Sequence, residues 1–248
     1  MWWTGGLILR PISLNSSMKN RGLFLFFTMS MVGLSMPAAA QTTGRLYDPE
    51  PPMDSGYVRV IVAAQTAPVD VLVDGQKRVR KLVAAELGEY MVLAEGKHTI
   101  TLSSFDKPEA LLSKVIEVVR GKSVTLAVTS IRKGAAIISF EDKGNTNKLK
   151  SVLTAYNLDP KAESLDVLTG DGNTKVFGGL AYGAMASIQV NPILVDLIVT
   201  NAGGKVPMSR TSLEMHQGAT YSVLLLGAGG GKTLIKTVQN RAERYTGK

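Results

Sequence analysis

The chain has 248 residues, of which 45% are hydrophobic and 19% are charged, and its formal net charge is +8. This is the composition of a globular protein with room for two domains of about 100 residues each. It contains no cysteine, which excludes disulfides, thiol nucleophiles, cysteine-ligated metal centres and lipid attachment through an N-terminal cysteine.

The first 40 residues have the order of a secretory signal. A positively charged start at 18–21 precedes an apolar stretch over 22–36 and small residues at 38–40. We therefore expect a signal peptide that is cleaved after Ala40, export to the periplasm, and no stable membrane span afterwards. A retained anchor is the alternative, but the apolar run is shorter than the roughly 20 residues that cross a bilayer. Residues 1–17 lie upstream of this complete signal.

Removal of these 40 residues takes away both tryptophans and three cations, which lowers the formal net charge to +5. A moderately basic surface suits a polyanion or an acidic protein. A nucleic acid is not expected as a partner.

The next part of the chain is predicted to be an arm followed by a β-domain. Residues 41–56 are rich in proline, which cannot donate a full ladder of hydrogen bonds, and we expect an extended arm. From 57 to 132, apolar and other residues alternate with the period of two that a half-buried strand requires, as in 58–62 and 69–73. Asp74-Gly75 is a natural hairpin turn.

An internal repeat organises the chain. Residues 133–148 are polar and turn-rich and are expected to be a linker, with room for one strand around 137–140, before a second domain over 149–248. Three segments recur in the same order about 96 residues further on: 69–75 with 165–172, 89–102 with 185–198, and 116–124 with 213–221. We therefore predict an all-β fold of two tandem antiparallel β-sandwich domains related by internal duplication. The tail after Lys232 is compatible with an edge strand or a short helix.

The sequence offers weak candidates for catalysis. The segment 227–233 resembles a phosphate-binding loop, but Leu226 stands where the first glycine of that loop is required. His98 follows a strand pattern, His216 precedes a turn, and neither has the motif of a Ser-His-Asp enzyme. Glu141-Asp142 is interpreted as a solvated acidic pair. We expect no catalytic residue, no cofactor and no metal site.

A run of four cations within five residues is the first binding candidate: Lys77, Arg78, Arg80 and Lys81. Strand alternation predicts Lys77 and Lys81 on one face and the two arginines on the other. One interpretation is an edge strand whose charges prevent unwanted pairing. The other is a binding site for a carboxylate-bearing polymer or an acidic partner.

Aromatic residues near the domain entries form a second binding candidate. Its tyrosines are Tyr47, Tyr57 and Tyr156, and Arg59 lies in the same predicted strand as Tyr57. Ordinary packing is the alternative for the three tyrosines. A sugar-binding surface built on tryptophan is disfavoured, because no tryptophan follows the signal.

Four short segments resemble the AlgF family of alginate biosynthesis proteins. They are LYDP at 46–49, SGYVRV at 55–60, VLAEGKHT at 92–99 and GATYSV at 218–223. The resemblance extends over roughly 45–228 and leaves out the glycine run and the tail. It implies a two-domain β-protein that is required for acetylating an exopolysaccharide while other proteins perform the acyl chemistry.

The leading hypothesis is therefore a noncatalytic periplasmic adaptor for O-acetylation of an exopolysaccharide such as alginate. Its expected partners are a periplasmic SGNH-type O-acetyltransferase or other polysaccharide-acetylation proteins, with the acidic polymer as a further ligand. The alternative is a stand-alone periplasmic carbohydrate-binding module for an acidic polysaccharide. An uncharacterised secreted enzyme is the third hypothesis.

Overall fold

The computed structural model describes residues 52–64, 66–107, 109–131 and 137–245. The predicted signal peptide and nearly all of the predicted arm, including Tyr47, lie outside these residues. All described residues belong to one compact unit, 45–248. They contain sixteen strands, and no helix among them is long and apolar enough to cross a membrane.

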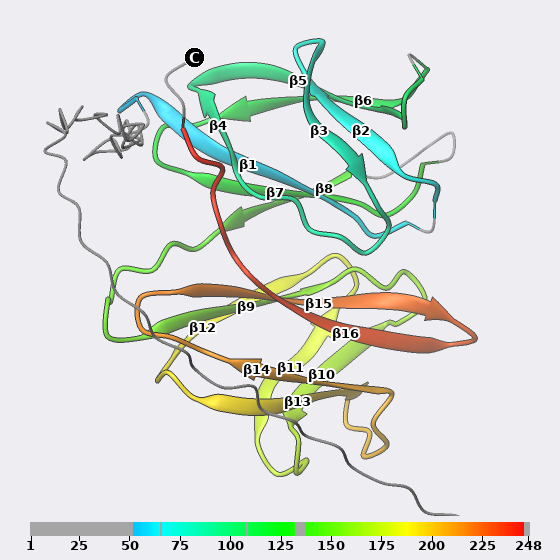
Figure 1. The fold of residues 1–248 in the computed structure, drawn as a ribbon. Coiled ribbons are helices and arrows are strands. Elements are labelled where there is room, and N and C mark those ends of the chain that lie inside the picture. Colours follow the sequence, from blue (N-terminus) through cyan, green and yellow to red (C-terminus); the bar gives the residue numbers. More distant parts are fainter. Residues whose placement is uncertain (1–51, 65, 108, 132–136, 246–248) are drawn as a thin grey trace, which may run out of the picture. The chain divides into compact units, whose positions relative to one another are not determined.

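The first half of this unit consists of two four-stranded sheets (Figure 1), with strand orders β4-β1-β7-β8 and β3-β2-β5-β6. The strands are β1 (Ser55–Val62), β2 (Val69–Val73), β3 (Gln76–Leu82), β4 (Met91–Ala94), β5 (Gly96–Ser104), β6 (Ala110–Val118), β7 (Ser123–Val128) and β8 (Ile137–Asp142).

The second half repeats this arrangement strand for strand, with orders β12-β9-β15-β16 and β11-β10-β13-β14. Its strands are β9 (Ser151–Asn157), β10 (Ser164–Thr169), β11 (Lys175–Ala181), β12 (Met185–Val190), β13 (Leu194–Asn201), β14 (Ser209–Glu214), β15 (Thr220–Gly229) and β16 (Lys232–Gln239). The predicted all-β fold of two duplicated sandwiches is confirmed.

One strand pair in each half departs from the antiparallel pattern. β1 pairs with β7 in parallel, and β9 pairs with β15 in parallel, whereas the other strand pairs that the structure describes are antiparallel. Between β1 and β7 the chain crosses to the opposite sheet twice and returns once as β4, so no tight hairpin fixes the relative direction of these two strands.

Each sandwich encloses its own apolar core. Alternate residues of β1, which are Val58, Val60 and Val62, point into the first core, and Leu153 and Ala155 of β9 point into the second. Small β-branched residues dominate the strands of the first core, as expected for side chains that fit a pleated surface.

A third apolar cluster joins the two halves, because β1 and β9 are buried on both faces. Ile61 of β1 and Phe140 of β8 pack with Tyr156 of β9 and Leu224 of β15 in this cluster. The rings of Phe140 and Tyr156 meet edge to face with centroids 5.2 Å apart, a geometry that aromatic pairs prefer. The sheets containing β1 and β9 therefore supply both faces of this junction.

Two segments that the sequence left undecided are now placed. The described part of 133–148 contains β8, which pairs with β7 and completes the first half's sheet. The tail forms strand β16 and then returns to the first half, where Tyr90 N–H donates to the Arg241 carbonyl (2.9 Å) and Glu243 N–H donates to the Tyr90 carbonyl (2.8 Å). Residues 240–243 therefore form a C-terminal strap across the junction.

Candidate functional site at the junction of the two halves

Arg59 lies at the centre of the junction. Its position in β1 turns its side chain away from the first core and toward the second half, and only 1% of the side chain is exposed. A buried charge is tolerated only where hydrogen bonds and an opposite charge replace its hydration. The residues that surround Arg59 therefore form a site imposed by the fold.

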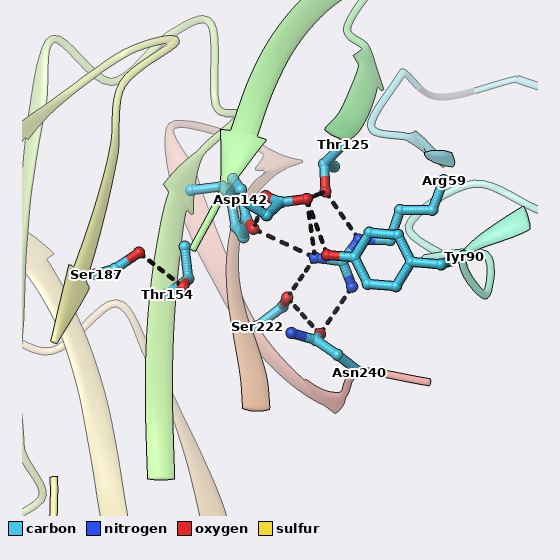
Figure 2. Close-up of polar contacts among 9 residues, drawn as sticks. Arg59, Tyr90, Thr125, Asp142, Thr154, Ser187, Ser222 and Asn240 are labelled. Atoms are coloured by element: carbon cyan, nitrogen blue, oxygen red, sulfur yellow. Dashed lines mark hydrogen bonds and ion pairs between the residues drawn. The ribbon is translucent and has the colours of Figure 1, made fainter. Parts of the chain in front are cut away.

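Three guanidinium nitrogens of Arg59 donate hydrogen bonds to both halves (Figure 2). The acceptors are Thr125 Oγ1 (2.8 Å from Nε), Asn240 Oδ1 (2.7 Å from Nη1), Ser222 Oγ (3.0 Å from Nη2) and Tyr156 OH (3.2 Å from Nη2). The guanidinium carbon also lies 4.2 Å from the centroid of the Tyr90 ring, within the range of a cation–π contact.

Asp142 balances the charge of Arg59. Its Oδ2 lies 3.9 Å from Arg59 Nη2 and accepts hydrogen bonds from Tyr90 OH (2.8 Å) and Thr125 Oγ1 (2.5 Å). Its Oδ1 accepts from Tyr156 OH at 2.5 Å. Burial, reinforced by the nearby carboxylate, raises the pKa of both tyrosines, so both stay protonated and act as donors. The earlier interpretation of Asp142 as solvated is wrong, because its side chain is only 6% exposed.

The duplication explains why the polar groups face each other. Arg59 pairs with Thr125 in the β1–β7 register, and Thr154 pairs with Ser222 in the equivalent β9–β15 register. Two equivalent hydroxyls, those of Thr125 and Ser222, thus contact one guanidinium. Thr154 takes the place of Arg59 in the second half and instead bonds Ser187 (Oγ1···Oγ 2.8 Å; Figure 2).

A pocket of about 360 Å³ opens beside this cluster and is lined by Arg59, by 86–89 and by 238–241. Glu86, Glu89 and Arg241 bring charges of both signs to it. The pocket can offer hydrogen bonds and charge to a ligand. Among the described residues, no group of three histidine, aspartate or glutamate side chains could hold a metal ion.

The two histidines lie away from this cluster. His98 bonds Asp74 Oδ2 through Nδ1 (2.7 Å) and the Ala94 carbonyl through Nε2 (2.8 Å). A hydrogen bond from the Thr99 N–H and one from His98 lower the pKa of Asp74. His216 is exposed, and its backbone N–H donates to the hydroxyl of Tyr221 at 3.0 Å.

Each cation of the basic run has a partner within the chain. Lys77 Nζ lies 2.5 Å from Asp70 Oδ2, Arg78 pairs with Glu243, and Arg80 donates two bonds to Asp106 at 3.0 and 3.1 Å. Lys81 Nζ lies 5.7 Å from the centroid of the Phe105 ring. Binding of an acidic ligand by this run stays a prediction, and the ligand must compete with these contacts.

Comparison with known proteins finds similarity that extends across both halves of the chain. A family model described as a domain of unknown function (DUF4397) matches residues 56–168. The alginate biosynthesis protein AlgF of Pseudomonas putida is 27% identical over 201 residues, which are 81% of this chain and 85% of that protein. AlgF of Pseudomonas syringae pv. tomato is 26% identical over 196 residues, 79% of this chain and 81% of that protein.

The resemblance to the AlgF family that the sequence segments indicated is confirmed over about four fifths of the chain. Among solved structures, the C-terminal domain of AlgF from P. aeruginosa is 23% identical and is covered completely by 38% of this chain, with a TM-score of 0.32.

The basic run does not follow the predicted alternation. Register shifts on both sides of Val71 interrupt the pairing of β2 with β3, and Lys81 has a φ of 58°. Lys77 and Arg80 consequently reach Asp70 and Asp106, which are joined by a hydrogen bond from Asp106 N–H to Asp70 Oδ2 (3.3 Å). The predicted assignment of faces is wrong, because one extra residue between Lys77 and Val79 turns Arg80 to the same side as Lys77.

The remaining predicted residues are placed as follows. Tyr57 is half-buried in β1, and Arg59 is held inside the junction. Sequence reasoning missed Asp142 and Asn240 as partners of Arg59. The period of two that places Phe140 in the third core also places Asp142 on that face of β8, so the sequence contained a signal for the burial of Asp142. Nothing in the sequence indicated that the tail returns to the first half and brings Asn240 to Arg59.

Proposed function

We propose that this protein is a noncatalytic periplasmic adaptor that is required for O-acetylation of an exopolysaccharide such as alginate, and that it acts by binding an acetyltransferase partner. The observation that carries the proposal is the relationship, over about four fifths of the chain, to proteins named for alginate biosynthesis. Secretion of such a polymer places its modification outside the cytoplasm, in agreement with the expected signal peptide.

The contacts of the polar groups support a role without catalysis. Acyl transfer by a serine needs a base within hydrogen-bond reach of the hydroxyl. Ser222, in the most densely bonded cluster described, donates to Asn240 Oδ1 at 2.7 Å, and an amide oxygen is not a useful base. His98 is held by a carboxylate and a carbonyl, so its ring serves β-strand structure rather than a serine.

The junction supports the role of an adaptor. The third core, the Arg59 cluster and the C-terminal strap tie the two sandwiches into one compact unit. The sheets β3-β2-β5-β6 and β11-β10-β13-β14 contribute no strand residue to the buried set of that core, which leaves their outer faces for contacts with other molecules.

The test is deletion of the gene in a strain that secretes the polymer, with complementation by the wild-type gene as the control. Polymer yield and acetyl groups per sugar residue are measured by proton NMR. We expect polymer to be made without acetyl groups and acetylation to return on complementation. Normal acetyl content in the deletion strain would overturn the proposal, and loss of all polymer would overturn its assignment to acetylation.

A second measurement addresses the partner and the lack of catalysis. The tagged protein, recovered from the periplasm of a producing strain, should bring down a polysaccharide acetyltransferase. The purified protein alone should not turn over acetyl esters. Turnover that is abolished by Ser222→Ala would contradict the noncatalytic role.

A further inference from the structure

Each half has a pocket on the outer face of its second sheet. The first pocket, of about 400 Å³, is lined by residues that include Leu72, Lys77, Ser103, Asp106 and Lys107. The second, of about 460 Å³, is lined by residues that include Leu168, Lys175, Thr200, Gly203 and Lys205. Neither pocket belongs to the junction described above.

The strand registers make these two pockets equivalent. In the first half, Leu72 lies opposite Lys77 and Asp70 lies opposite Ser103. In the second half, the corresponding pairs are Leu168 with Lys175 and Asp166 with Thr200. The same positions of the repeat therefore supply an apolar wall, a lysine and a hydroxyl to each pocket.

A buried carboxylate orients the first lysine of each pocket. Lys77 Nζ lies 2.5 Å from Asp70 Oδ2, and Lys175 Nζ lies 2.7 Å from Asp166 Oδ2. Both carboxylates are almost completely buried, whereas 44% of the Lys77 side chain and 52% of the Lys175 side chain are exposed. An ammonium has three donors, so each lysine can bind a second acceptor at the mouth of its pocket.

The backbone around the two carboxylates is also repeated. Asp70 accepts from the N–H groups of Lys81 (2.9 Å) and Asp106 (3.3 Å), and Asp166 accepts from those of Gly179 (2.7 Å) and Gly203 (3.0 Å). All four donor residues have a positive φ, between 55° and 71°. A positive φ is costly for Lys81 and Asp106, yet both halves keep it. The N–H groups that it directs at the carboxylate hold the ion pair with Lys77 or Lys175 in place.

A second lysine lies at each pocket. Lys107 lines the first and Lys205 lines the second, both are exposed, and neither forms an ion pair with another described residue. The acidic groups at the mouths are already engaged. Asp106 pairs with Arg80, and Asp171 accepts hydrogen bonds from Thr169 and Asn173.

We infer that the two pockets are equivalent subsites, each for one carboxylated sugar residue of an anionic polysaccharide. The two ammonium groups suit a carboxylate, and Leu72 or Leu168 offers a wall for the apolar face of a sugar ring. A volume of 400 to 460 Å³ suits a ligand of one or two sugar units. The choice of an acidic polysaccharide rests on the proposed function, whereas the equivalence of the pockets does not.

Titration of the purified protein with a short uronic acid oligomer, a tetramer, tests this inference. Amide chemical shifts should report two sites per chain, one near Lys77 and one near Lys175. Binding should weaken as salt rises, because the ammonium–carboxylate contacts lie at the surface. A neutral glucose tetramer should not bind. One site per chain, none, or equal binding of the neutral oligomer would overturn the inference.

Charge reversal at the second lysines tests the pockets without breaking the buried pairs. Lys107→Glu should leave only the site near Lys175, and Lys205→Glu should leave only the site near Lys77. The double variant should bind the tetramer at least tenfold more weakly than the wild type. Lys143→Glu with Lys161→Glu is the matched control, since it changes exposed lysines outside both pockets and alters the net charge equally. An equal loss in the control would show attraction by net charge alone and would overturn the subsites.

The result of the tetramer titration can be distinguished from the result of the gene deletion. Normal acetylation in the deletion strain would remove the adaptor role but would leave two measurable sites in the purified protein. Absence of tetramer binding would remove the subsites and leave the adaptor role intact.

Discussion

Arg59 and Asp142 are the residues on which the junction depends. The guanidinium lies at 1% exposure and the carboxylate at 6%, and their hydrogen bonds come from strands of both halves. Burying two charges costs free energy that their attraction repays only when the remaining donors and acceptors are satisfied. Here tyrosine and threonine hydroxyls donate hydrogen bonds to the carboxylate, and Arg59 balances its charge. Removal of either charged partner therefore leaves the other as a buried charge without its counter-ion.

A double-mutant cycle measures this dependence. Arg59→Met and Asp142→Asn should each lower the free energy of unfolding by about 3–5 kcal/mol, because each leaves a buried group uncompensated. The double variant should lose less than the sum of the two, since no unpaired charge remains. Urea unfolding at neutral pH gives the three values. Strictly additive losses would show that the two side chains are not coupled.

At the scale of elements, the last strand and the tail behave as one strap. β16 pairs with β15 in the second half, and the residues after it pair with Tyr90 in the first. Two side chains of the tail reach buried or half-buried groups: Asn240 accepts from Arg59, and Glu243 accepts from the N–H of Val92 (2.9 Å) and from Arg78.

Truncation after Gln239 should therefore destabilise the whole protein, although it removes no residue of the sixteen strands. Arg59 Nη1 and Val92 N–H would each lose an acceptor, and a buried donor without a partner costs about 1–3 kcal/mol. We expect a loss of about 3 kcal/mol in urea unfolding. Truncation after Tyr245 keeps these contacts and serves as the control. Equal stability of the two truncated proteins would mean that the strap contributes nothing.

The strands and the duplication could be predicted from the sequence, but the contacts between the two sandwiches could not. Alternating valines in 58–62 and 69–73 and the 96-residue repeat specify strands and duplication, because these signals are local or periodic. The bulge at Lys81 depends on a hydrogen bond to Asp70, and no local pattern indicates it. Arg59 and Asn240 are 181 positions apart, so their contact follows only from the packing of two completed sandwiches.

At the scale of the molecule, both halves depend on an equivalent buried carboxylate. Burial by itself would raise the pKa of Asp70, but hydrogen bonds from Lys77 and from the N–H groups of Lys81 and Asp106 outweigh it and lower the pKa. The same balance, with Lys175, Gly203 and Gly179 as donors, lowers the pKa of Asp166. The ionised form of each carboxylate therefore stabilises its own sandwich.

These shifts predict a loss of stability in acid that affects both halves together. A group whose pKa is lower in the folded state contributes its full stabilisation above its unfolded pKa, which is about 3.9 for aspartate, and loses it as the pH falls through the folded pKa. The melting temperature should therefore be constant from neutral pH to about pH 5 and fall steeply below about pH 4. Thermal unfolding followed by circular dichroism, from neutral pH to below about pH 4, measures the melting temperature.

Asparagine variants at the two positions identify the carboxylates responsible. Asp70→Asn and Asp166→Asn should each lower the melting temperature at neutral pH, because Lys77 or Lys175 loses its partner, and each should flatten the fall in acid. The double variant should flatten it further, since the two halves carry independent copies of the same group. Asp196→Asn, which removes an exposed partner of Arg210, is the control and should leave the acid slope unchanged. A slope in the double variant equal to that of the wild type would assign the acid sensitivity to other groups.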